Sequence, residues 1–280
     1  FIPKILENIA SANIAIDYNI QGPSFTVSTA CSSGGDAINT ACMCMQSGKA
    51  DIMLAVGAES VLCPLVIYSL ANAKALSRRN DSPSTASRPF DVTRDGFVIG
   101  EGGGALVLET EEHALARGAK IYAEIRGCGN TDDAYHVTAP HPEGRGAIAC
   151  MKQAIAEAGI NPSDIGYINA HGTATNKGDT VETSSIKKVF GNTLPYVSST
   201  KGATGHMMGA GGITETITCV KAIETGTVPP TINLNEVDPE CAGIDFVANT
   251  AKKAEINFAM SNAFGFGGQN SSIIVGKYGK

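Results

Sequence analysis

Short apolar, β-rich runs alternate along this chain with segments whose apolar residues recur at helical spacing. The alternation occurs twice, over residues 24–76 and 121–224, and residues 77–118 lie between the two stretches. Such alternation predicts an α/β fold with a helix-covered, largely buried sheet. We therefore expect a duplicated α/β architecture, although no residue-level repeat, linker or low-complexity segment is visible.

The individual elements follow from the spacing of apolar residues and from glycine and proline at their ends. Strands are expected at residues 24–30, 51–57, 105–108, 121–125, 165–170, 196–200, 256–263 and 271–276, and helices near residues 34–46, 65–76, 148–158, 178–190 and 209–224. The run at residues 51–57 is apolar without alternation, which is typical of a strand buried on both faces.

Composition excludes several classes of function. A hydrophobic content of 43% with only 17% charged residues excludes a disordered chain. A net charge of −6 without a basic run argues against a nucleic-acid-binding surface. No apolar stretch reaches the roughly 18 residues that a membrane span needs. The eight cysteines lack the spacing of a disulfide framework, so we expect reduced thiols and a cytoplasmic protein.

Cys31 is the first candidate for chemistry. It directly follows a predicted strand and precedes a glycine-containing helix start, Ser32–Gly35. Unpaired backbone N–H groups and the helix dipole at such a position favour a thiolate. The alternative is a small buried residue, and that is how we interpret the other seven cysteines. Cys42 and Cys44 are one residue apart on a helix and point to different sides, which favours core positions over metal ligands.

Two histidines also follow predicted strands, His171 in the segment 169–175 and His206 in the segment 198–206. Ligand sites in open α/β sheets gather at the carboxyl ends of strands. A cysteine with a histidine is the minimum for catalysis by a thiol nucleophile. We expect His113 to lie on a surface helix and assign it no role. His136 and His141 come near Asp132 and Asp133 in the sequence, but we interpret this segment as a solvated loop and not as a metal site.

Two glycine-rich segments, residues 100–104 and 264–268, fit neither the phosphate-loop pattern nor the dinucleotide-binding pattern. Close approach of two backbones explains such glycines better. A turn at residues 264–268 would also place a backbone N–H group in a catalytic pocket.

Four motifs occur in order along the chain: residues 27–34 (VSTACSSG), residues 169–175 (NAHGTAT) followed by Gly178 and Asp179, residues 199–206 (STK to GH), and residues 262–268 (NAFGFGG). Together they closely resemble the β-ketoacyl-acyl-carrier-protein synthases, the condensing enzymes of fatty acid synthesis. The elongating synthase II type is the nearest match, and residues 88–97 agree with it. The resemblance covers the whole supplied sequence.

The resemblance implies the thiolase fold, with two similar α/β halves in five layers (α/β/α/β/α), and a homodimer. We place the halves at residues 1–118, carrying the nucleophile, and 119–280, carrying the histidines. Family members have a substantial portion before the position of Phe1, so we expect the first half to be incomplete here. The implied reaction is the decarboxylative condensation of an acyl group on Cys31 with malonyl-carrier to give 3-oxoacyl-carrier.

The resemblance also implies a role for each matched residue. For catalysis, Cys31 and Phe264 would supply the oxyanion-hole N–H groups, His171 and His206 would stabilise the enolate, and Lys201 and Glu215 would orient the two histidines. For the substrate, Thr173 and Thr175 would bind the pantetheine, while Phe264 would gate the acyl channel and, with Phe266, bind the substrate. Asp179 would be structural, and the acidic acyl carrier protein would dock on Lys74, Arg78 and Arg79. No metal or diffusible cofactor is implied, because the substrates are carried on the phosphopantetheine of the acyl carrier protein.

Two alternatives remain open. A polyketide ketosynthase shares all of these motifs. A non-catalytic fragment, acting as a scaffold or dimer partner, belongs to a different class and would show no selective reactivity at Cys31.

Overall fold

A six-stranded mixed sheet forms the centre of the computed structural model, which describes residues 2–279. The strands, in spatial order, are β3 (Glu124–Asp132), β10 (Gln269–Gly276), β9 (Phe258–Phe264), β4 (Ile165–Asn169), β5 (Tyr196–Ser198) and β7 (Asp245–Phe246). The pairs β3–β10 and β10–β9 are antiparallel, whereas β9–β4, β4–β5 and β5–β7 are parallel. The strands predicted in the second half of the chain therefore all join one sheet.

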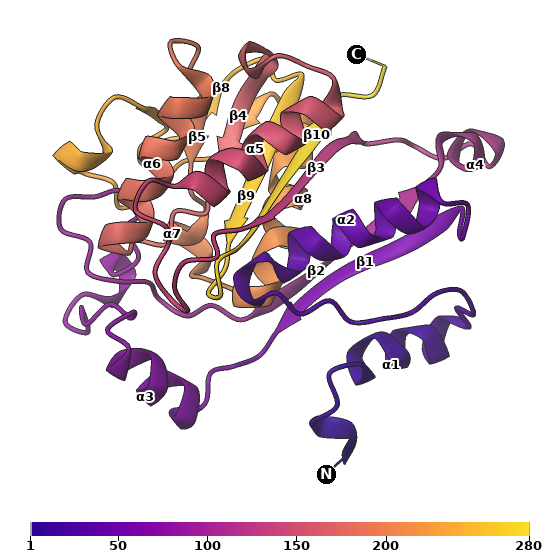
Figure 1. The fold of residues 1–280 in the computed structure, drawn as a ribbon, viewed down its shortest axis with the longest axis horizontal. Coiled ribbons are helices and arrows are strands. Elements are labelled where there is room, and N and C mark those ends of the chain that lie inside the picture. Colours follow the sequence, from indigo (N-terminus) through magenta and orange to yellow (C-terminus); the bar gives the residue numbers. More distant parts are fainter. Residues whose placement is uncertain (1, 280) are drawn as a thin grey trace.

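Helices cover both faces of this sheet (Figure 1). On one face lie α5 (Arg145–Ala158) and α6 (Asn176–Phe190), and on the other lie α2 (Ser33–Gln46) and α8 (Gly211–Thr225). The antiparallel pair β1 (Ile52–Glu59) and β2 (Gly102–Glu109) packs on the far side of α2 and α8, and α1 (Ile9–Tyr18) lies outside β1. The order of layers is α/β/α/β/α, as the resemblance implies.

The smaller elements lie outside these layers. They are α3 (Pro64–Asn72), α4 (Glu111–Ala116), α7 (Lys201–Thr204), and the short pair β6 (Thr227–Val228) and β8 (Lys252–Lys253). Within residues 2–279, no helix is long and apolar enough to cross a membrane.

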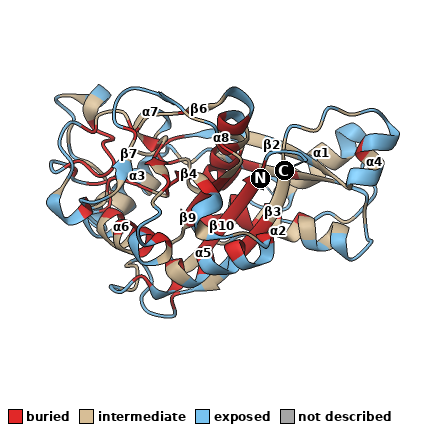
Figure 2. Ribbon diagram, turned by 90° about the horizontal axis from the view of Figure 1, so that it is seen from above, coloured by how far each residue is buried: buried red, intermediate tan, exposed pale blue. Residues whose placement is uncertain are grey.

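Strand alternation divides the core between the two faces of the six-stranded sheet. Ile274, Met260 and Ile168 pack with α5 and α6, and their chain neighbours Ile273, Ala259 and Tyr167 pack with α2 and α8. Figure 2 shows the buried residues concentrated in α8 and in the strands β9 and β10. The sheet is thus buried on both faces, which holds the loops at its strand ends in fixed positions.

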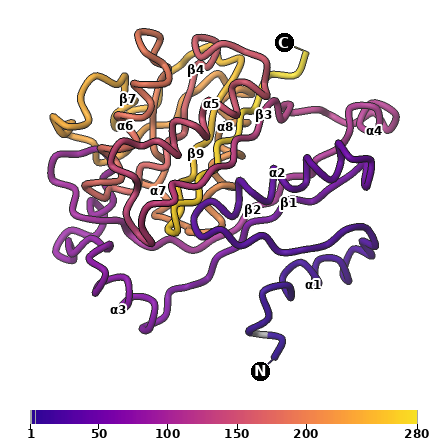
Figure 3. The backbone as a smooth tube through the Cα atoms, viewed as in Figure 1, coloured from indigo at the N-terminus to yellow at the C-terminus, as the bar shows by residue number. Residues whose placement is uncertain are grey.

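Two expectations for the first half are wrong. Residues 24–29 are not a strand, because none of their backbone groups joins a ladder within residues 2–279. β1 forms as predicted but is not buried on both faces, and Ile52 is 45% exposed. A cavity of about 510 Å³, lined by residues of α1, β1 and the extended segment that precedes α2, lies on the open side of β1. Figure 3 shows α1 and this extended segment running beside β1.

Candidate active site

Cys31 lies in a tight turn directly before α2. Ala30, its predecessor, has φ = 51°, a left-handed conformation that is uncommon for a residue with a side chain. Ser33 holds the turn: its Oγ accepts a hydrogen bond from the N–H of Thr29 (2.9 Å) and donates one to the carbonyl of Ala30 (2.7 Å). The turn therefore presents the Cys31 side chain above the first turn of the helix.

The structure brings both predicted histidines to Cys31. His171 follows β4 and His206 follows β5, and these two strands are parallel neighbours, so their carboxyl ends meet at the same sheet edge. The imidazole rings are edge to face with centroids 5.3 Å apart. His206 Nε2 lies 3.1 Å from Cys31 Sγ, within hydrogen-bonding distance for sulfur. A thiol and two imidazoles therefore share one site.

The ionisation of Cys31 differs from the sequence-based expectation. Burial raises the pKa of Cys31 to about 11, although a backbone N–H group and the charge of Lys201 act in the opposite direction. Burial also lowers the pKa of His171 and of His206 well below the usual value, and Lys201 adds to the shift. The resting site thus holds a neutral thiol beside two neutral imidazoles.

A buried ion pair lies behind the histidines. Lys201, in α7, is 1% exposed, and its Nζ contacts Glu215 Oε1 in α8. Burial raises the pKa of Glu215, and the charge of Lys201 opposes this shift. The charge of Lys201 adds to the effect of burial in lowering the pKa of His171 and of His206.

The backbone N–H group that acts on the Cys31 sulfur belongs to Phe266, two residues after the Phe264 that the sequence analysis assigned to the oxyanion hole. Phe264 is the last residue of β9, and its ring packs against His171 with centroids 5.9 Å apart. Phe266 lies in the turn after β9, and its backbone N–H group lowers the pKa of the Cys31 thiol. At Gly265, a Cβ would lie 2.8 Å from the carbonyl of Thr29, so only glycine fits between the two turns.

A cavity of about 620 Å³ opens over these groups. Its lining includes Cys31, His171, His206, Thr173, Thr175, Phe97, Phe264 and Phe266. The hydroxyls of Thr173 and Thr175 are 3.0 Å apart and hydrogen-bonded to each other. Leu65, Val66 and Leu70 of α3 add an apolar wall. The cavity therefore combines reactive groups, a hydroxyl pair and a surface that suits a hydrocarbon chain.

Glu182 is a site residue that the sequence analysis missed. It is buried in α6, and its two carboxylate oxygens accept the backbone N–H groups of His171 (2.8 Å) and Gly172 (2.7 Å). The signal was available, because Glu182 lies three residues after Asp179 and so on the same side of a predicted helix. The carboxylate fixes the backbone from which the His171 ring projects.

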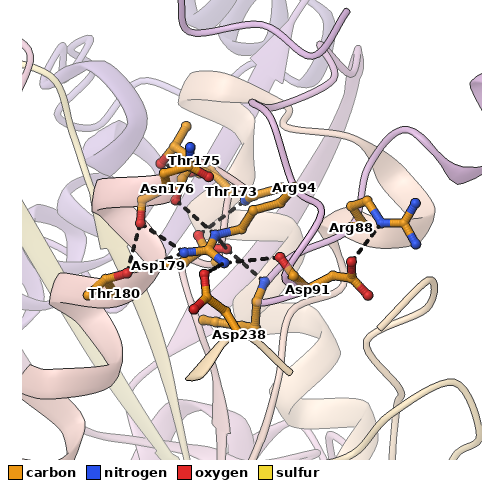
Figure 4. A network of polar contacts seen from close by, with 12 residues as sticks. Arg88, Asp91, Arg94, Thr173, Thr175, Asn176, Asp179, Thr180 and Asp238 are labelled. Carbon is orange, nitrogen blue, oxygen red and sulfur yellow. Dashed lines mark hydrogen bonds and ion pairs between the residues drawn. The ribbon is translucent and has the colours of Figure 1, made fainter. Parts of the chain in front are cut away.

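Arg94 is the second residue without a predicted role (Figure 4). Its guanidinium lies 3.4 Å from Asp179 and 2.5 Å from Asp238, and it donates a hydrogen bond to the carbonyl of Asn176 (3.0 Å). Asp179 in turn accepts the backbone N–H of Ala174 (3.1 Å). Arg94 thus ties a segment of the first half to the loop that follows His171.

The same segment also reaches His206. The ring of Phe97 packs edge to face with the His206 ring, with centroids 5.2 Å apart. The carbonyl of Val98 accepts the backbone N–H of His206 (2.7 Å). We call residues 90–98 the strap, because they contact the loops of both histidines.

The structure places the remaining candidates away from the sulfur. Lys74 and Arg78 are exposed after α3, whereas Arg79 is half-buried and donates to the carbonyl of Thr93. Their role in docking stays a prediction. His136 and His141 lie in a loop, where each Nδ1 accepts backbone N–H groups.

Family models match most of the chain. The model "Beta-ketoacyl synthase, N-terminal domain" matches residues 1–114, and "Beta-ketoacyl synthase, C-terminal domain" matches residues 122–235. The chain is 48% identical to 3-oxoacyl-[acyl-carrier-protein] synthase 2 of Rhizobium meliloti, over 99% of this chain and 66% of that protein. It is 47% identical to the mitochondrial 3-oxoacyl-[acyl-carrier-protein] synthase of Arabidopsis thaliana, over 98% of this chain and 60% of that protein.

Solved structures agree with the fold. A ketosynthase of a type II polyketide synthase, in complex with its acyl-carrier protein, matches with a TM-score of 0.94 at 38% identity, over 96% of this chain and 67% of that one. The ishigamide ketosynthase/chain length factor matches with a TM-score of 0.92 at 37% identity, over 98% of this chain and 66% of that one. The chain spans about two thirds of the length of these relatives.

Proposed function

The chain belongs to the beta-ketoacyl synthase family, and from this premise we propose that it condenses an acyl thioester with malonyl-[acyl-carrier-protein]. The product is a 3-oxoacyl-[acyl-carrier-protein], as in fatty acid elongation. The observation that carries the proposal is the position of His206 Nε2, 3.1 Å from Cys31 Sγ and beside His171. A second imidazole is unnecessary for thiol acylation alone, but it suits a step that develops an oxyanion.

The first step transfers the acyl group to Cys31. Because the thiol is neutral, its proton must leave before the sulfur attacks, and His206 Nε2 is within reach to accept it. The sulfur attacks the acyl carbonyl, and the N–H groups of Cys31 and Phe266 stabilise the tetrahedral oxyanion. The carbon–sulfur bond to the carrier then breaks, and the carrier thiolate takes the proton from His206.

The second step removes carbon dioxide from the malonyl thioester. His171 and His206 donate N–H hydrogen bonds to its thioester oxygen, where negative charge develops as the enolate forms. His206 accepts a proton through Nε2 in the first step and donates from the same atom in the second, so the ring changes tautomer between the two steps. The low pKa of both rings keeps them neutral donors.

The third step forms the carbon–carbon bond. The enolate carbon attacks the thioester carbonyl on Cys31, and the same two backbone N–H groups hold the oxyanion. Collapse of this intermediate releases the Cys31 thiolate, which takes a proton from water, and leaves the 3-oxoacyl chain on the carrier. Thr173 and Thr175 line the cavity where hydroxyls would hydrogen-bond the amides of phosphopantetheine.

Identity favours fatty acid elongation over polyketide synthesis. The curated relatives named 3-oxoacyl-[acyl-carrier-protein] synthase are 45–48% identical, whereas the polyketide ketosynthase with its carrier is 38% identical. We infer that the acyl carrier protein is the partner that delivers both substrates. We also infer a homodimer, because apolar side chains are exposed on and after α1, with Ile16 76% and Tyr18 77% exposed. Eight free cysteines fit a reducing compartment such as the cytoplasm.

The test follows each step separately in three variants. Cys31→Ala should abolish the acyl-enzyme detected by mass spectrometry. His171→Ala should slow decarboxylation of malonyl-carrier by about 10²–10³-fold and leave acylation unchanged, because loss of one oxyanion donor has that effect. His206→Ala should slow both steps, because its Nε2 is in reach of the Cys31 proton in the first step and donates to the malonyl thioester oxygen in the second. Condensation retained in Cys31→Ala, or equal loss of both steps in His171→Ala, would refute the proposal.

A further inference from the structure

Two thiols face each other where α2 packs against the six-stranded sheet. The contact is close, because a Cβ at Gly35 would lie 2.4 Å from Ser271 Oγ. Cys42 follows Gly35 by two helical turns and therefore lies on the same side of α2. Ile273 follows Ser271 on the same face of β10, and its ladder partner is Cys128 of β3. This register places the Cys42 side chain against the Cys128 side chain.

The contacts agree with this placement. Cys42 packs against the buried cluster that contains Cys128, and the side chains of the two cysteines interact with each other. Cys42 is half-buried, whereas Cys128 is 3% exposed. Neither residue lines the cavity that contains Cys31. The pair is therefore separate from the proposed catalytic site.

The two sulfurs are chemically unequal. The hydrogen bond from Cys128 lowers the pKa of Cys42, and Glu157 opposes that shift. Donating this hydrogen bond, together with burial, raises the pKa of Cys128. Because a thiolate is the form that reacts with oxidants, the half-buried Cys42 is the sulfur that reacts first.

We propose that Cys42 and Cys128 form a reversible disulfide when the protein meets a peroxide. The Cys42 thiolate attacks one peroxide oxygen, the O–O bond breaks, and hydroxide leaves, which gives a sulfenic acid. The Cys128 sulfur then attacks the Cys42 sulfur, the S–O bond breaks, and water leaves with the Cys128 proton. The two sulfurs together lose two electrons, and the peroxide oxygens gain them. A dithiol reductant reverses the reaction by thiol–disulfide exchange.

The bond would join α2, which begins at the Cys31 turn, to an edge strand of the sheet in the second half. It closes the long loop between residues 42 and 128, and such a cross-link stabilises a fold by restricting the unfolded chain. We therefore expect the oxidised protein to unfold at a higher temperature. The inference does not depend on the proposed reaction, because its test detects a covalent bond and a change in Tm and does not measure condensation.

The experiment uses the full chain, reduced and then exposed to hydrogen peroxide. Free thiols are blocked with N-ethylmaleimide, and peptides are mapped without reduction. The expected result is a peptide that links Cys42 to Cys128, a rise in Tm of roughly 5–10 °C, and loss of both on adding dithiothreitol. Cys44→Ser is the matched control on the same helix and should retain the link, whereas Cys42→Ser should abolish it.

Three outcomes would overturn the inference. One is absence of the linked peptide at peroxide exposures that already oxidise Cys31. Another is a bond from Cys42 to Cys44 in place of Cys128. The third is an equal rise in Tm for Cys42→Ser. This variant changes a half-buried position, so the test does not require the more deeply buried Cys128 to be replaced.

Discussion

At Cys31 two effects act on the same sulfur in opposite directions. The start of α2 and the N–H of Phe266 favour a thiolate, and so does the charge of Lys201. Removal of the side chain from water favours the neutral thiol, and here it is the larger effect. Sequence alone shows the helix start but not the depth of burial, which is why it predicts a thiolate where the structure has a thiol.

This difference gives a pH dependence with a definite sign. A pKa of about 11 leaves about one Cys31 in ten thousand ionised at pH 7, and this fraction rises about tenfold per pH unit. Labelling of Cys31 by iodoacetamide, followed by peptide mapping, should therefore still rise between pH 8.5 and 9.5. A cysteine in an unstructured peptide, whose thiol has a pKa near 8.5, should level off in the same range. A Cys31 rate that is already constant at pH 7 would show that the helix terminus dominates.

The strap, residues 90–98, is the element that couples the two halves at the site. Arg94 is almost completely buried and is its main anchor, since it faces the carboxylates of Asp179 and Asp238 together. Burial raises the pKa of Asp179 to about 7 even with Arg94 present. Removing the guanidinium would leave two carboxylates without their shared cation beneath the loop that carries His171. Arg94 is therefore a positioning residue and not a catalytic one.

Arg94→Gln should lower the free energy of unfolding by about 3–5 kcal/mol, the usual cost of breaking a buried ion pair from one side. It should also raise the KM for malonyl-carrier, while iodoacetamide still labels Cys31. Without Arg94 the pKa of Asp179 rises further, so the native state binds a proton that the unfolded state lacks. The stability of the variant should then fall as pH rises. In urea unfolding, the decrease in the free energy of unfolding caused by the substitution should be smaller at pH 6 than at pH 8.

Two further variants separate charge from shape. Arg94→Lys retains the positive charge without the planar guanidinium. Its KM for malonyl-carrier should therefore lie between that of the unchanged protein and that of Arg94→Gln. Arg94→Gln combined with Asp179→Asn should regain stability, because one uncompensated carboxylate is gone. An additive loss in the double variant, or an unchanged KM in Arg94→Gln, would contradict the positioning role.

Elements with a complete local signal were predictable from the sequence. The helix expected at residues 34–46 forms at Ser33–Gln46. Its apolar side lies within the segment, and Gly48, which was expected to end it, follows directly after. Residues 102–104 were not included in the strand expected at residues 105–108, and their glycines were predicted only to allow close approach of two backbones. In the structure they belong to β2. A larger side chain would not fit beside α8 at this point, because a Cβ at Gly104 would lie 3.0 Å from the Ile217 side chain. The glycines indicate a close approach, but nothing in the segment identifies the residues that it packs against.

The site shows the same limit. His171 and His206 could be found because each comes after a predicted strand that forms. Cys31 was found through the helix start that follows it, although the strand expected before it does not form. Glu182 and Arg94 act through backbone atoms of other segments. The spacing from Asp179 could have drawn attention to Glu182, but nothing near Arg94 in the sequence names its partners. Likewise, the choice between Phe264 and Phe266 depends on which N–H points at the sulfur, and this is a property of the turn geometry.

At the scale of the whole molecule, the net charge of −6 opposes the approach of an acidic carrier protein, which the family resemblance leads us to expect. Docking therefore needs a local basic surface, and Lys74 and Arg78 are exposed close to α3, which walls the cavity. Rim charges act mainly on the rate of encounter and are screened by salt. Their effect should consequently be confined to the carrier-borne substrate.

Lys74→Glu should raise the KM for acyl-carrier about threefold to tenfold at low salt, the range expected when one exposed attraction becomes a repulsion. The KM for a small acyl thioester should not change, because that substrate makes no contact with the rim. Lys277→Glu is the matched control: it lies on the exposed C-terminal segment after β10 and changes the net charge equally. Salt should diminish the difference between the two variants.

An equal rise in KM for both variants would mean that net charge acts without a docking surface. An equal rise for both substrates would place the effect of Lys74 inside the cavity.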